Sequence, residues 1–419
     1  MLSRMMKVGW AGLAAIATLS LGAAITNACG RKGQTPPAKP APVSAKVSPA
    51  LWQVHLSEVN QGEPAPVAEW TVAELATSIA GLGMDIPGVD HEAKTVDVLV
   101  YPWQESVLLQ VYPNAKKSAV QVADQVADSR YKTPETVIST LYGIARKYPG
   151  MVDIAQIGQT HKERPIMAAR LGSREENKKV IVFDAMHHAR ELMTPEVALD
   201  IIEQLASGSD PELDELLKTV EVWVVPQVNP DGNNLVWTAN TMQRKNANPS
   251  GHTDNNRNYP WKWGQCGGSS GTVSNEQYRG RSANSEPETK AMVELGRMLK
   301  GQLKMYISYH SYSEMVLLAG GCQGERTSPE QRAFGQELGR LHKRDRGGGP
   351  YAVGQSWELL YPTDGVSADW FAGELGAYAY VIELNGSSAG FQPPYSYRDP
   401  TVQMARAGWK AAIKKTSTL

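Results

Sequence analysis

Between residues 131 and 419 the sequence alternates apolar, β-rich runs with helical stretches, and this alternation restricts the fold most. The β-type runs are "KKVIVFDAM", "VEVWVVPQV", "KMYISYH" and "AYAYVIEL", and helix-type segments start at Pro195, Glu286 and Pro329. Such alternation predicts a largely parallel sheet between layers of helices. We therefore expect an α/β fold with a mixed, largely parallel central sheet flanked by helices, preceded by a small α+β N-terminal unit.

The smaller unit has its own helix and strand signals. The segment "TVAELATSIAGL" begins with the spacing of a capping box, which predicts a helix, and the alternating "TVDVLVY" predicts a strand. A new helix start follows, where Thr133 can cap the helix and Pro134 fits its first position. These signals divide the chain into an α+β unit over residues 51–130 and a main domain over residues 131–419.

The N-terminus has the layout of an export signal. Arg4 and Lys7 precede an apolar run that is rich in small residues, and Ala28 offers a cleavage site. This pattern predicts a signal peptide over residues 1–28 in preference to a retained transmembrane anchor. We therefore expect an exported protein.

Cys29 directly follows the expected cleavage site. Its surroundings, "TNACG", resemble a bacterial lipoprotein box, in which the cysteine becomes the lipidated first residue. The proline-rich residues 29–50 show no apolar periodicity, so they predict an extended tether. A lipid anchor at Cys29, which would be the only membrane contact, and free secretion both remain open.

Composition and cysteine usage limit the partners of the chain. With 42 basic and 43 acidic residues the formal net charge is −1, and no basic block indicates a nucleic-acid partner. We expect a monomer. Beyond Cys29, only Cys266 and Cys322 remain. An exported chain meets an oxidising compartment, so a disulfide between these two cysteines is expected.

Histidines and a glutamate fall at the ends of three predicted strands. His187 and His188 follow "KKVIVFDAM", His310 ends "KMYISYH", and Glu383 lies near the end of "AYAYVIEL". Ligands of open α/β sheets bind beyond the carboxyl ends of the strands, so these groups are expected at one edge of the sheet. The pairing of His188 with a glutamate three residues later is, by itself, a weak metal motif.

Several short motifs occur in a fixed order along the main domain: "HARE", "QRK", "NNRN", "HSY", "YPTDGVSADW" and "VIEL". Together with "YKTPETVISTL", the turn "NPDG" and the stretch "YRGRSANSEPET", they resemble the zinc metallocarboxypeptidases of the pancreatic carboxypeptidase A type. The resemblance runs from about Tyr131 to the C-terminus. Arg190 stands before Glu191, where the regulatory branch of that family usually has Asn, so the resemblance favours the digestive branch.

This resemblance implies a catalytic zinc site. Matched onto "HARE" and "HSY", the ligands of one Zn²⁺ are His188, Glu191 and His310. Two imidazoles and a carboxylate suit a catalytic zinc with an open position, although other divalent ions accept the same ligand types. His187 is expected to point away from the metal, where it packs or supports the ligands.

The resemblance also implies two catalytic residues. Glu383 matches the glutamate that takes a proton from the attacking water and passes it to the leaving amine. Arg244 of "QRK" matches the arginine that polarises the scissile carbonyl and stabilises the oxyanion. Lys245 is the competing candidate for that role, but a planar guanidinium is what the family uses.

Substrate recognition is implied in the same way. Asn256, Arg257 and Tyr361 match residues that bind the terminal carboxylate, because Arg offers bidentate, charge-assisted hydrogen bonds. Arg190 and Tyr312 would line the next subsite. The implied specificity pocket consists of Leu317, Gly321, Ser356, Leu360, Thr363, Val366, Ala368 and Val381.

The character of this pocket predicts the residue that is removed. Its floor position, Ala368, is acidic in relatives that prefer Lys and Arg, so a mostly neutral pocket here favours large apolar or aromatic C-terminal residues. Asp364 is the exception, because basic residues become acceptable if its carboxylate turns inward.

The expected activity is hydrolysis of the C-terminal peptide bond of peptides and proteins with a free terminal carboxylate. Residues 51–130 lie where this family carries an inhibitory prosegment, with cleavage near Arg130, and a permanent accessory domain remains open. Two alternatives are a cell-wall (murein) peptide hydrolase on the same scaffold and a non-catalytic, peptide-binding surface lipoprotein. Release of diaminopimelate from murein peptides would favour the first alternative.

Overall fold

The computed structural model describes residues 49–59, 70–118 and 127–419 of the chain. The expected signal peptide, Cys29 and the tether up to residue 48 lie outside these described residues. Across the described ranges, no helix is long and apolar enough to cross a membrane.

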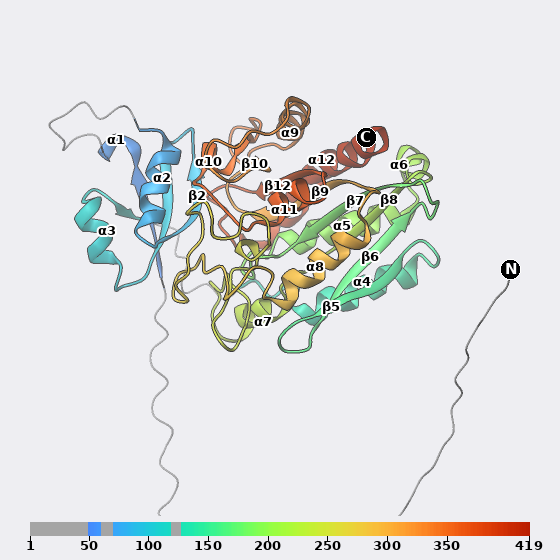
Figure 1. The fold of residues 1–419 in the computed structure, drawn as a ribbon, viewed down its shortest axis with the longest axis horizontal. Helices are drawn as coiled ribbons and strands as arrows, with labels where there is room; N and C mark the ends of the chain where they lie inside the picture. The colour runs from blue at the N-terminus through green and yellow to red at the C-terminus, as the bar shows by residue number, and fades with distance from the viewer. Residues whose placement is uncertain (1–48, 60–69, 119–126) are drawn as a thin grey trace, which may run out of the picture. The chain divides into compact units, whose positions relative to one another are not determined.

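The N-terminal unit is built around a four-stranded antiparallel sheet in the order β2-β3-β1-β4 (Figure 1). Its elements are β1 (Ala50–His55), α1 (Leu56–Val59), α2 (Val72–Gly81), β2 (Asp85–Asp90), β3 (Thr95–Val100), α3 (Glu105–Val111) and β4 (Lys116–Lys117). The predicted capping box is present at the start of α2, where the Thr71 hydroxyl and the Glu74 carboxylate each accept the other residue's backbone N–H.

The main domain contains an eight-stranded mixed sheet in the order β11-β10-β12-β9-β7-β8-β6-β5. The strands are β5 (Asp153–Gln159), β6 (Pro165–Gly172), β7 (Lys179–Ala185), β8 (Val220–Val225), β9 (Leu303–Ser311), β10 (Met315–Leu318), β11 (Ala352–Gln355) and β12 (Tyr378–Leu384). The central strands β12, β9, β7 and β8 are mutually parallel, whereas β10 pairs antiparallel with β12, and β6 and β5 form an antiparallel edge. The predicted mixed, largely parallel sheet is confirmed.

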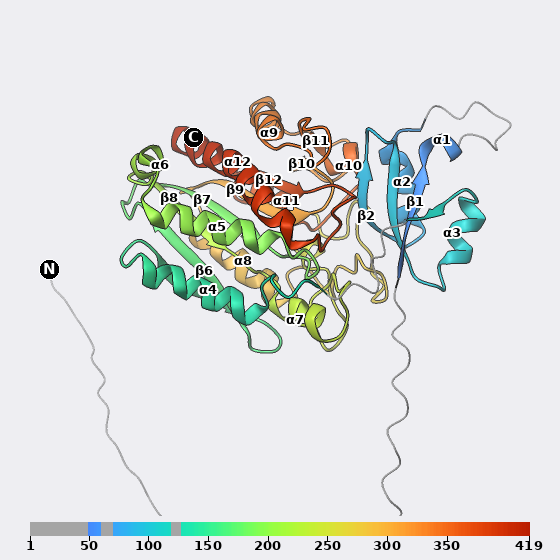
Figure 2. The same ribbon diagram turned by 180° about the vertical axis from the view of Figure 1, so that it is seen from behind.

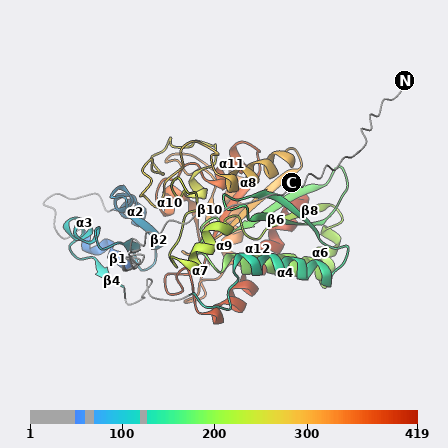
Figure 3. The same cartoon turned by 90° about the horizontal axis from the view of Figure 1, so that it is seen from below.

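Helices cover both faces of this sheet. They are α4 (Pro134–Lys147), α5 (Thr194–Ser207), α6 (Pro211–Leu216), α7 (Pro230–Thr238), α8 (Pro287–Met298), α9 (Pro329–Leu341), α10 (Ser356–Leu359), α11 (Ser367–Gly373) and α12 (Arg398–Thr418), with short 3₁₀ turns η1 (Asn255–Arg257) and η2 (Tyr395–Tyr397). Helices α4, α5 and α12 lie on one face (Figure 2), and α8 and α11 lie on the other (Figure 3).

Each face of the sheet has its own apolar core. Leu141 of α4 and Trp409 of α12 belong to one cluster of buried side chains. Met292 of α8 and Phe371 of α11 belong to the second cluster, which continues into the N-terminal unit. Strands buried on both faces are mostly apolar, so the Val-rich runs of β7 and β8 follow from this layering, and the buried carboxylates of Asp184 and Glu221 in these strands are hydrogen-bonded.

The sheet register brings the candidate functional groups together. Glu383 of β12 pairs directly with His310 of β9, and the neighbouring strand β7 ends at Ala185, shortly before His188. The carboxyl ends of three adjacent parallel strands therefore meet at one edge of the sheet, as the rule for open α/β sheets predicts.

Candidate active site and metal centre

Two histidines and a glutamate converge at the carboxyl ends of β7 and β9. His188 Nδ1 lies 2.6 Å from Glu191 Oε1 and 3.1 Å from His310 Nδ1. His310 Nδ1 lies 3.1 Å from Glu191 Oε2. All three side chains are buried. Three atoms with lone pairs, one from each residue, therefore lie within 4.8 Å of one another.

The chemistry of this donor set fits a divalent cation. When each neutral ring carries its proton on Nε2, the lone pairs of both Nδ1 atoms face each other and the Glu191 carboxylate, an arrangement that a cation between them would stabilise. The buried Glu191 Oε2 also has no hydrogen-bond partner among the described residues. Burial would raise the pKa of Glu191, but the two imidazoles more than offset this and lower it. Two imidazole nitrogens and a carboxylate match a catalytic zinc site in type and number.

Asp254 supports this centre, and sequence reasoning missed it. Its Oδ1 lies 3.2 Å from His188 Nε2, the ring nitrogen that faces away from the other ligands, although the two atoms make no well-aligned hydrogen bond. Its Oδ2 accepts hydrogen bonds from the Nε and NH2 groups of Arg244, at 3.1 and 2.9 Å. Burial would raise the pKa of Asp254, but Arg244 and His188 hold it well below its usual value. One buried carboxylate thus binds a candidate catalytic arginine and lies beside a candidate metal ligand.

His187 lies on the other side of the extended segment, as predicted. Its Nε2 lies 2.8 Å from the Tyr259 hydroxyl, and its ring stacks on His310 with the ring centroids 5.5 Å apart. Its Nδ1 is 3.4 Å from the Asp184 carboxylate. His187 therefore packs against a candidate ligand and does not join the three atoms of the cluster.

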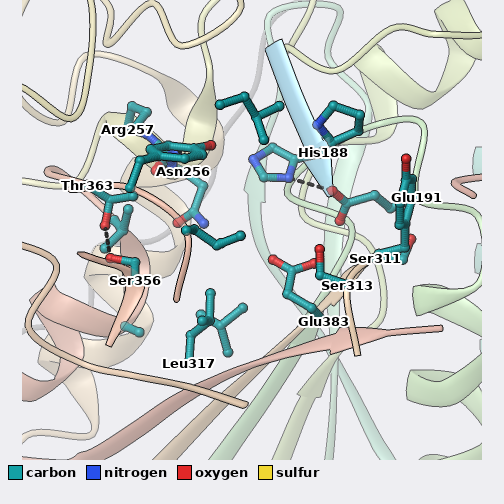
Figure 4. A pocket seen from close by; sticks show the side chains of 18 of the residues that line it. His188, Glu191, Asn256, Arg257, Ser311, Ser313, Leu317, Ser356, Thr363 and Glu383 are labelled. Carbon is teal, nitrogen blue, oxygen red and sulfur yellow. Dashed lines mark hydrogen bonds and ion pairs between the residues drawn. The ribbon is translucent and has the colours of Figure 1, made fainter. Parts of the chain in front are cut away.

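Glu383 faces the same cavity as His188 and Glu191 (Figure 4). Within the described chain, no hydrogen-bond donor engages its carboxylate. Burial raises its pKa well above the usual range, and the nearby Glu191 carboxylate raises it further, while Arg244 and Arg257 oppose the shift. The group is therefore placed to carry a proton beside the candidate metal site.

Arg257 is held by backbone carbonyls at the cavity wall. Its Nε donates to the Gly268 carbonyl at 3.1 Å and its NH1 donates to the Asn256 carbonyl at 2.7 Å. Its NH2 is 3.5 Å from the Tyr361 hydroxyl. The Asn256 side-chain oxygen accepts from the backbone N–H of Ser367. The three residues predicted to bind a carboxylate therefore lie together and line one cavity.

Most of the predicted specificity residues line this cavity as well. They are Leu317, Ser356, Leu360, Thr363, Val366, Ala368 and Val381, and Tyr312 lines it too. Gly321 is not one of the lining residues, because it sits behind Thr363, where an added Cβ would come within 2.2 Å of the threonine hydroxyl. The Ser356 and Thr363 hydroxyls, 2.8 Å apart, form a polar spot in the wall.

Two aspartates near this pocket are engaged by backbone groups. Asp364 does not line the cavity, because its carboxylate accepts from the backbone N–H groups of Gly264, Cys266 and Gly268 and from the Ser269 hydroxyl. Asp369 lines the cavity, but it accepts from the N–H groups of two glycines, 320 and 321, at 2.7 and 3.0 Å. Burial raises the pKa of Asp369 to about 6.

The two cysteines of the main domain form a disulfide bond. Cys266 and Cys322 have Cα atoms 5.3 Å apart. The bond joins the loop that surrounds Asp364 to the loop that follows β10, next to Gly321.

The N-terminal unit contributes to the wall of the same cavity. Ile86 and Pro87 of β2 are lining residues. Asp85 Oδ2 lies 2.6 Å from the NH2 group of Arg190, and the Tyr312 hydroxyl donates to Asp97 at 3.0 Å. Arg190 was predicted to line a subsite, but here it is not a lining residue, because it pairs with Asp85 instead.

The zinc carboxypeptidase family model (Peptidase_M14) matches residues 137–408 of this chain. The chain belongs to the zinc carboxypeptidase family. Its members use one zinc ion, and the resemblance to carboxypeptidases of the pancreatic type is confirmed. The chain is thus a zinc-dependent metallocarboxypeptidase.

Individual carboxypeptidases agree with this assignment. A zinc carboxypeptidase of Simulium vittatum is 30% identical over 282 residues, covering 65% of this chain and 92% of that protein. Carboxypeptidase A2 of Mus musculus is 33% identical over 300 residues, covering 68% of this chain and 70% of that protein. The crystal structure of the carboxypeptidase A from Helicoverpa armigera matches the fold with a TM-score of 0.75 at 20% identity, covering 90% of this chain and 99% of that one.

Proposed function

We propose that this carboxypeptidase removes single C-terminal residues from peptides and proteins, with a preference for large apolar or aromatic side chains. The observation that carries the proposal is that one cavity is lined by His188, Glu191, Glu383, Arg244 and Arg257. Candidate groups for metal binding, proton transfer, oxyanion stabilisation and carboxylate binding therefore surround a single space.

The proposed chemistry assigns the proton to Glu383. When Zn²⁺ is held by His188, Glu191 and His310, it supplies a Lewis acid and lowers the pKa of water. Glu383 accepts the proton of the attacking water at its carboxylate and delivers it to the nitrogen of the leaving amino acid. No donor among the described residues engages the Glu383 carboxylate, which supports this role, because a carboxylate that already accepts several donors is a poor base.

Arg244 and Arg257 act on different oxygens of the substrate. The Arg244 guanidinium, fixed from behind by Asp254, polarises the scissile carbonyl and stabilises the oxyanion. The Arg257 guanidinium binds the terminal carboxylate together with Asn256 and Tyr361. Since its Nε and NH1 groups are oriented by carbonyl oxygens, Arg257 is held in place before substrate arrives.

The specificity pocket, which lies beyond the carboxylate-binding Arg257, is suited to an apolar side chain. Leu317, Leu360, Val366 and Val381 form its apolar wall, and the small Ala368 leaves room for a large residue. Asp364 is turned into a neighbouring loop, and the Asp369 carboxylate, which lines the cavity, already accepts two glycine N–H groups, so neither is free to pair with a lysine. Burying an unpaired ammonium here would be costly, whereas a phenyl or isobutyl group gains from burial.

We further propose that residues 51–130 act as an inhibitory prosegment. The unit places Ile86 and Pro87 in the cavity and pairs Asp85 with Arg190, so it occupies space that a peptide substrate needs. Gly88 packs so closely on Tyr312 that an added Cβ would lie 2.5 Å from its ring. The exposed Arg130 side chain offers a site for the cleavage that would release the domain.

We also propose that residues 1–28 are a signal peptide that directs export of the chain. The mature chain would begin at Cys29 if it is a lipoprotein, and the mass of its N-terminal peptide, isolated from the cells that make it, distinguishes a lipidated cysteine from a free one. A monomeric mass in light scattering is the expected result for the soluble portion.

The direct test follows amino-acid release from N-blocked dipeptides that end in Phe, Leu, Lys or Glu. The full-length chain is assayed with zinc before and after limited proteolysis with trypsin, and again with a chelator. We expect release of Phe and Leu that increases after proteolysis and is abolished by the chelator. Preference for Lys would contradict the neutral pocket. No release from any substrate by folded, zinc-loaded and proteolysed protein would refute the proposed function, and diaminopimelate release from murein peptides would replace it.

A further inference from the structure

The loop formed by residues 264–270, here called the anchor loop, supports Arg257 directly. Its Gly268 carbonyl accepts the Arg257 Nε hydrogen at 3.1 Å and so sets the plane of the guanidinium. The loop also packs against the turn that carries Tyr361. An added Cβ on Gly268 would lie 2.3 Å from the Pro362 carbonyl oxygen. Any shift of the anchor loop therefore moves the groups that would bind a terminal carboxylate.

The buried Asp364 carboxylate accepts hydrogen bonds from several groups of the anchor loop. Asp364 accepts backbone N–H groups from Cys266 at 2.9 Å and from Gly264 and Gly268 at 3.2 Å, and it also accepts the Ser269 hydroxyl. Asp364 is 1% exposed. It follows Tyr361 by three positions, so it ties the loop beneath Arg257 to the turn that bears the tyrosine.

The disulfide ties the same loop to the specificity pocket. Cys266 lies in the anchor loop, and Cys322 follows Gly321, whose carbonyl accepts the Thr363 backbone N–H at 2.9 Å. Besides the covalent bond, both loops contact the turn of Tyr361 and Thr363, and an ion pair between Lys262 and Glu325 links the segment just before the anchor loop to the loop after β10. The disulfide therefore connects the anchor loop to the loop after β10, and both loops contact the turn of Tyr361 and Thr363 near Arg257.

We infer that Asp364 and the Cys266–Cys322 disulfide are positioning groups for carboxylate recognition, and that reduction of the disulfide weakens binding of the terminal carboxylate. The inference rests on the proposed role of Arg257. Neither group touches the cluster of His188, Glu191 and His310, so the chemical step is expected to be spared.

A purely stabilising disulfide predicts a different pattern from a positioning one. If the bond only stabilises the fold, its loss lowers the melting temperature and leaves KM and kcat of the folded fraction unchanged. If the disulfide positions Arg257, its loss raises KM and changes kcat little, because a displaced Arg257 guanidinium binds the substrate carboxylate more weakly in the ground state. We expect a rise in KM of about 10- to 100-fold, by analogy with the loss caused by removing groups that orient a metal ligand.

The experiment compares Asp364→Asn and the double variant Cys266→Ser/Cys322→Ser with wild type, each as full-length protein after limited proteolysis. A matched control is Asp210→Asn, which removes another carboxylate that accepts backbone N–H groups, at the start of α6. Helix α6 lies at the opposite end of the main sheet from α10 (Figure 1). Kinetics with a blocked dipeptide ending in Phe are combined with calorimetric binding of 3-phenylpropanoate and its amide.

The expected result is a raised KM and weaker 3-phenylpropanoate binding in both test variants, with kcat within about twofold of wild type and the control unchanged. The amide should lose no affinity, because it lacks the carboxylate. If the serine variant fails to fold, reduction and reoxidation of wild type replace it, and KM should rise and then recover. Unchanged KM in Asp364→Asn and in reduced wild type overturns the inference. Wild type that shows neither release nor 3-phenylpropanoate binding refutes the carboxylate site itself, and with it both proposals.

Discussion

Replacing Asp85 by Ala should activate the uncleaved protein. Asp85 Oδ2 and the Arg190 NH2 group are 2.6 Å apart, and the two residues are 4% and 1% exposed. Breaking a buried ion pair by removing one partner costs about 3–5 kcal/mol, because the remaining charge is left unpaired. These two atoms make no well-aligned hydrogen bond, so the lower end of that range applies here. About 3 kcal/mol corresponds to about 100-fold in the equilibrium between covered and open active sites.

The assay measures initial rates on a Phe-ended substrate for intact and proteolysed protein. Intact Asp85→Ala should be up to about 100-fold faster than intact wild type, limited by the rate of the proteolysed enzyme, which should be identical for both. Glu92→Gln is the control, because Glu92 pairs with Arg344 while its own side chain is 80% exposed. Such a pair contributes at most about 1 kcal/mol, so the control should change the intact rate by less than about fivefold. Equal intact rates for Asp85→Ala and wild type, with full activity after proteolysis, would refute the docking argument.

Three further changes test the site and the core. Glu383→Gln should lower kcat by about 10²- to 10⁴-fold with little change in KM, and unchanged turnover would exclude Glu383 as the base. Ala368→Asp should raise kcat/KM for Lys-ended relative to Phe-ended substrates by at least about tenfold, and an unchanged ratio would show that position 368 does not face the bound side chain. Burial raises the pKa of Glu288 from 4.5 to about 8, so its contribution to stability is complete below pH 4.5 and is lost as pH rises through 8. Glu288→Gln should therefore flatten the fall in urea midpoint between pH 5 and 9, and an unaltered slope would contradict this.

Much of the main domain could be predicted because its signals are local. Thr133 and Pro134 begin α4 as expected, with the Thr133 hydroxyl accepting the Thr136 N–H. Strands buried on both faces show as apolar runs, and the rule that ligands bind at carboxyl strand ends placed His310 and Glu383 at one edge. The direct pairing of these two residues across β9 and β12 depends on sheet register, which no local pattern specifies.

The supporting carboxylates were harder to predict, because each acts across a long stretch of chain. Asp254 contacts His188, yet its position just before "NNRN" was the only available signal, an acidic residue beside an expected binding motif. The direction of the Asp364 side chain depends on the N–H groups of a loop about a hundred residues earlier in the chain. Arg190 was predicted to serve substrate, and its pairing with Asp85 could not be anticipated from either local sequence.

Strand β2 shows why such failures cluster at functional contacts. Its sequence, DIPGVD, is a poor strand former, because Pro87 donates no backbone hydrogen bond and Gly88 weakens a strand. Both residues are tolerable here because β2 is an edge strand, with a register shift between Asp85 and Gly88. The composition matches what the cavity accepts: Pro87 lines it, and only a residue without a Cβ fits against Tyr312. The sequence of β2 is therefore explained by its packing against the main domain and not by strand propensity. This agrees with a role in covering the active site.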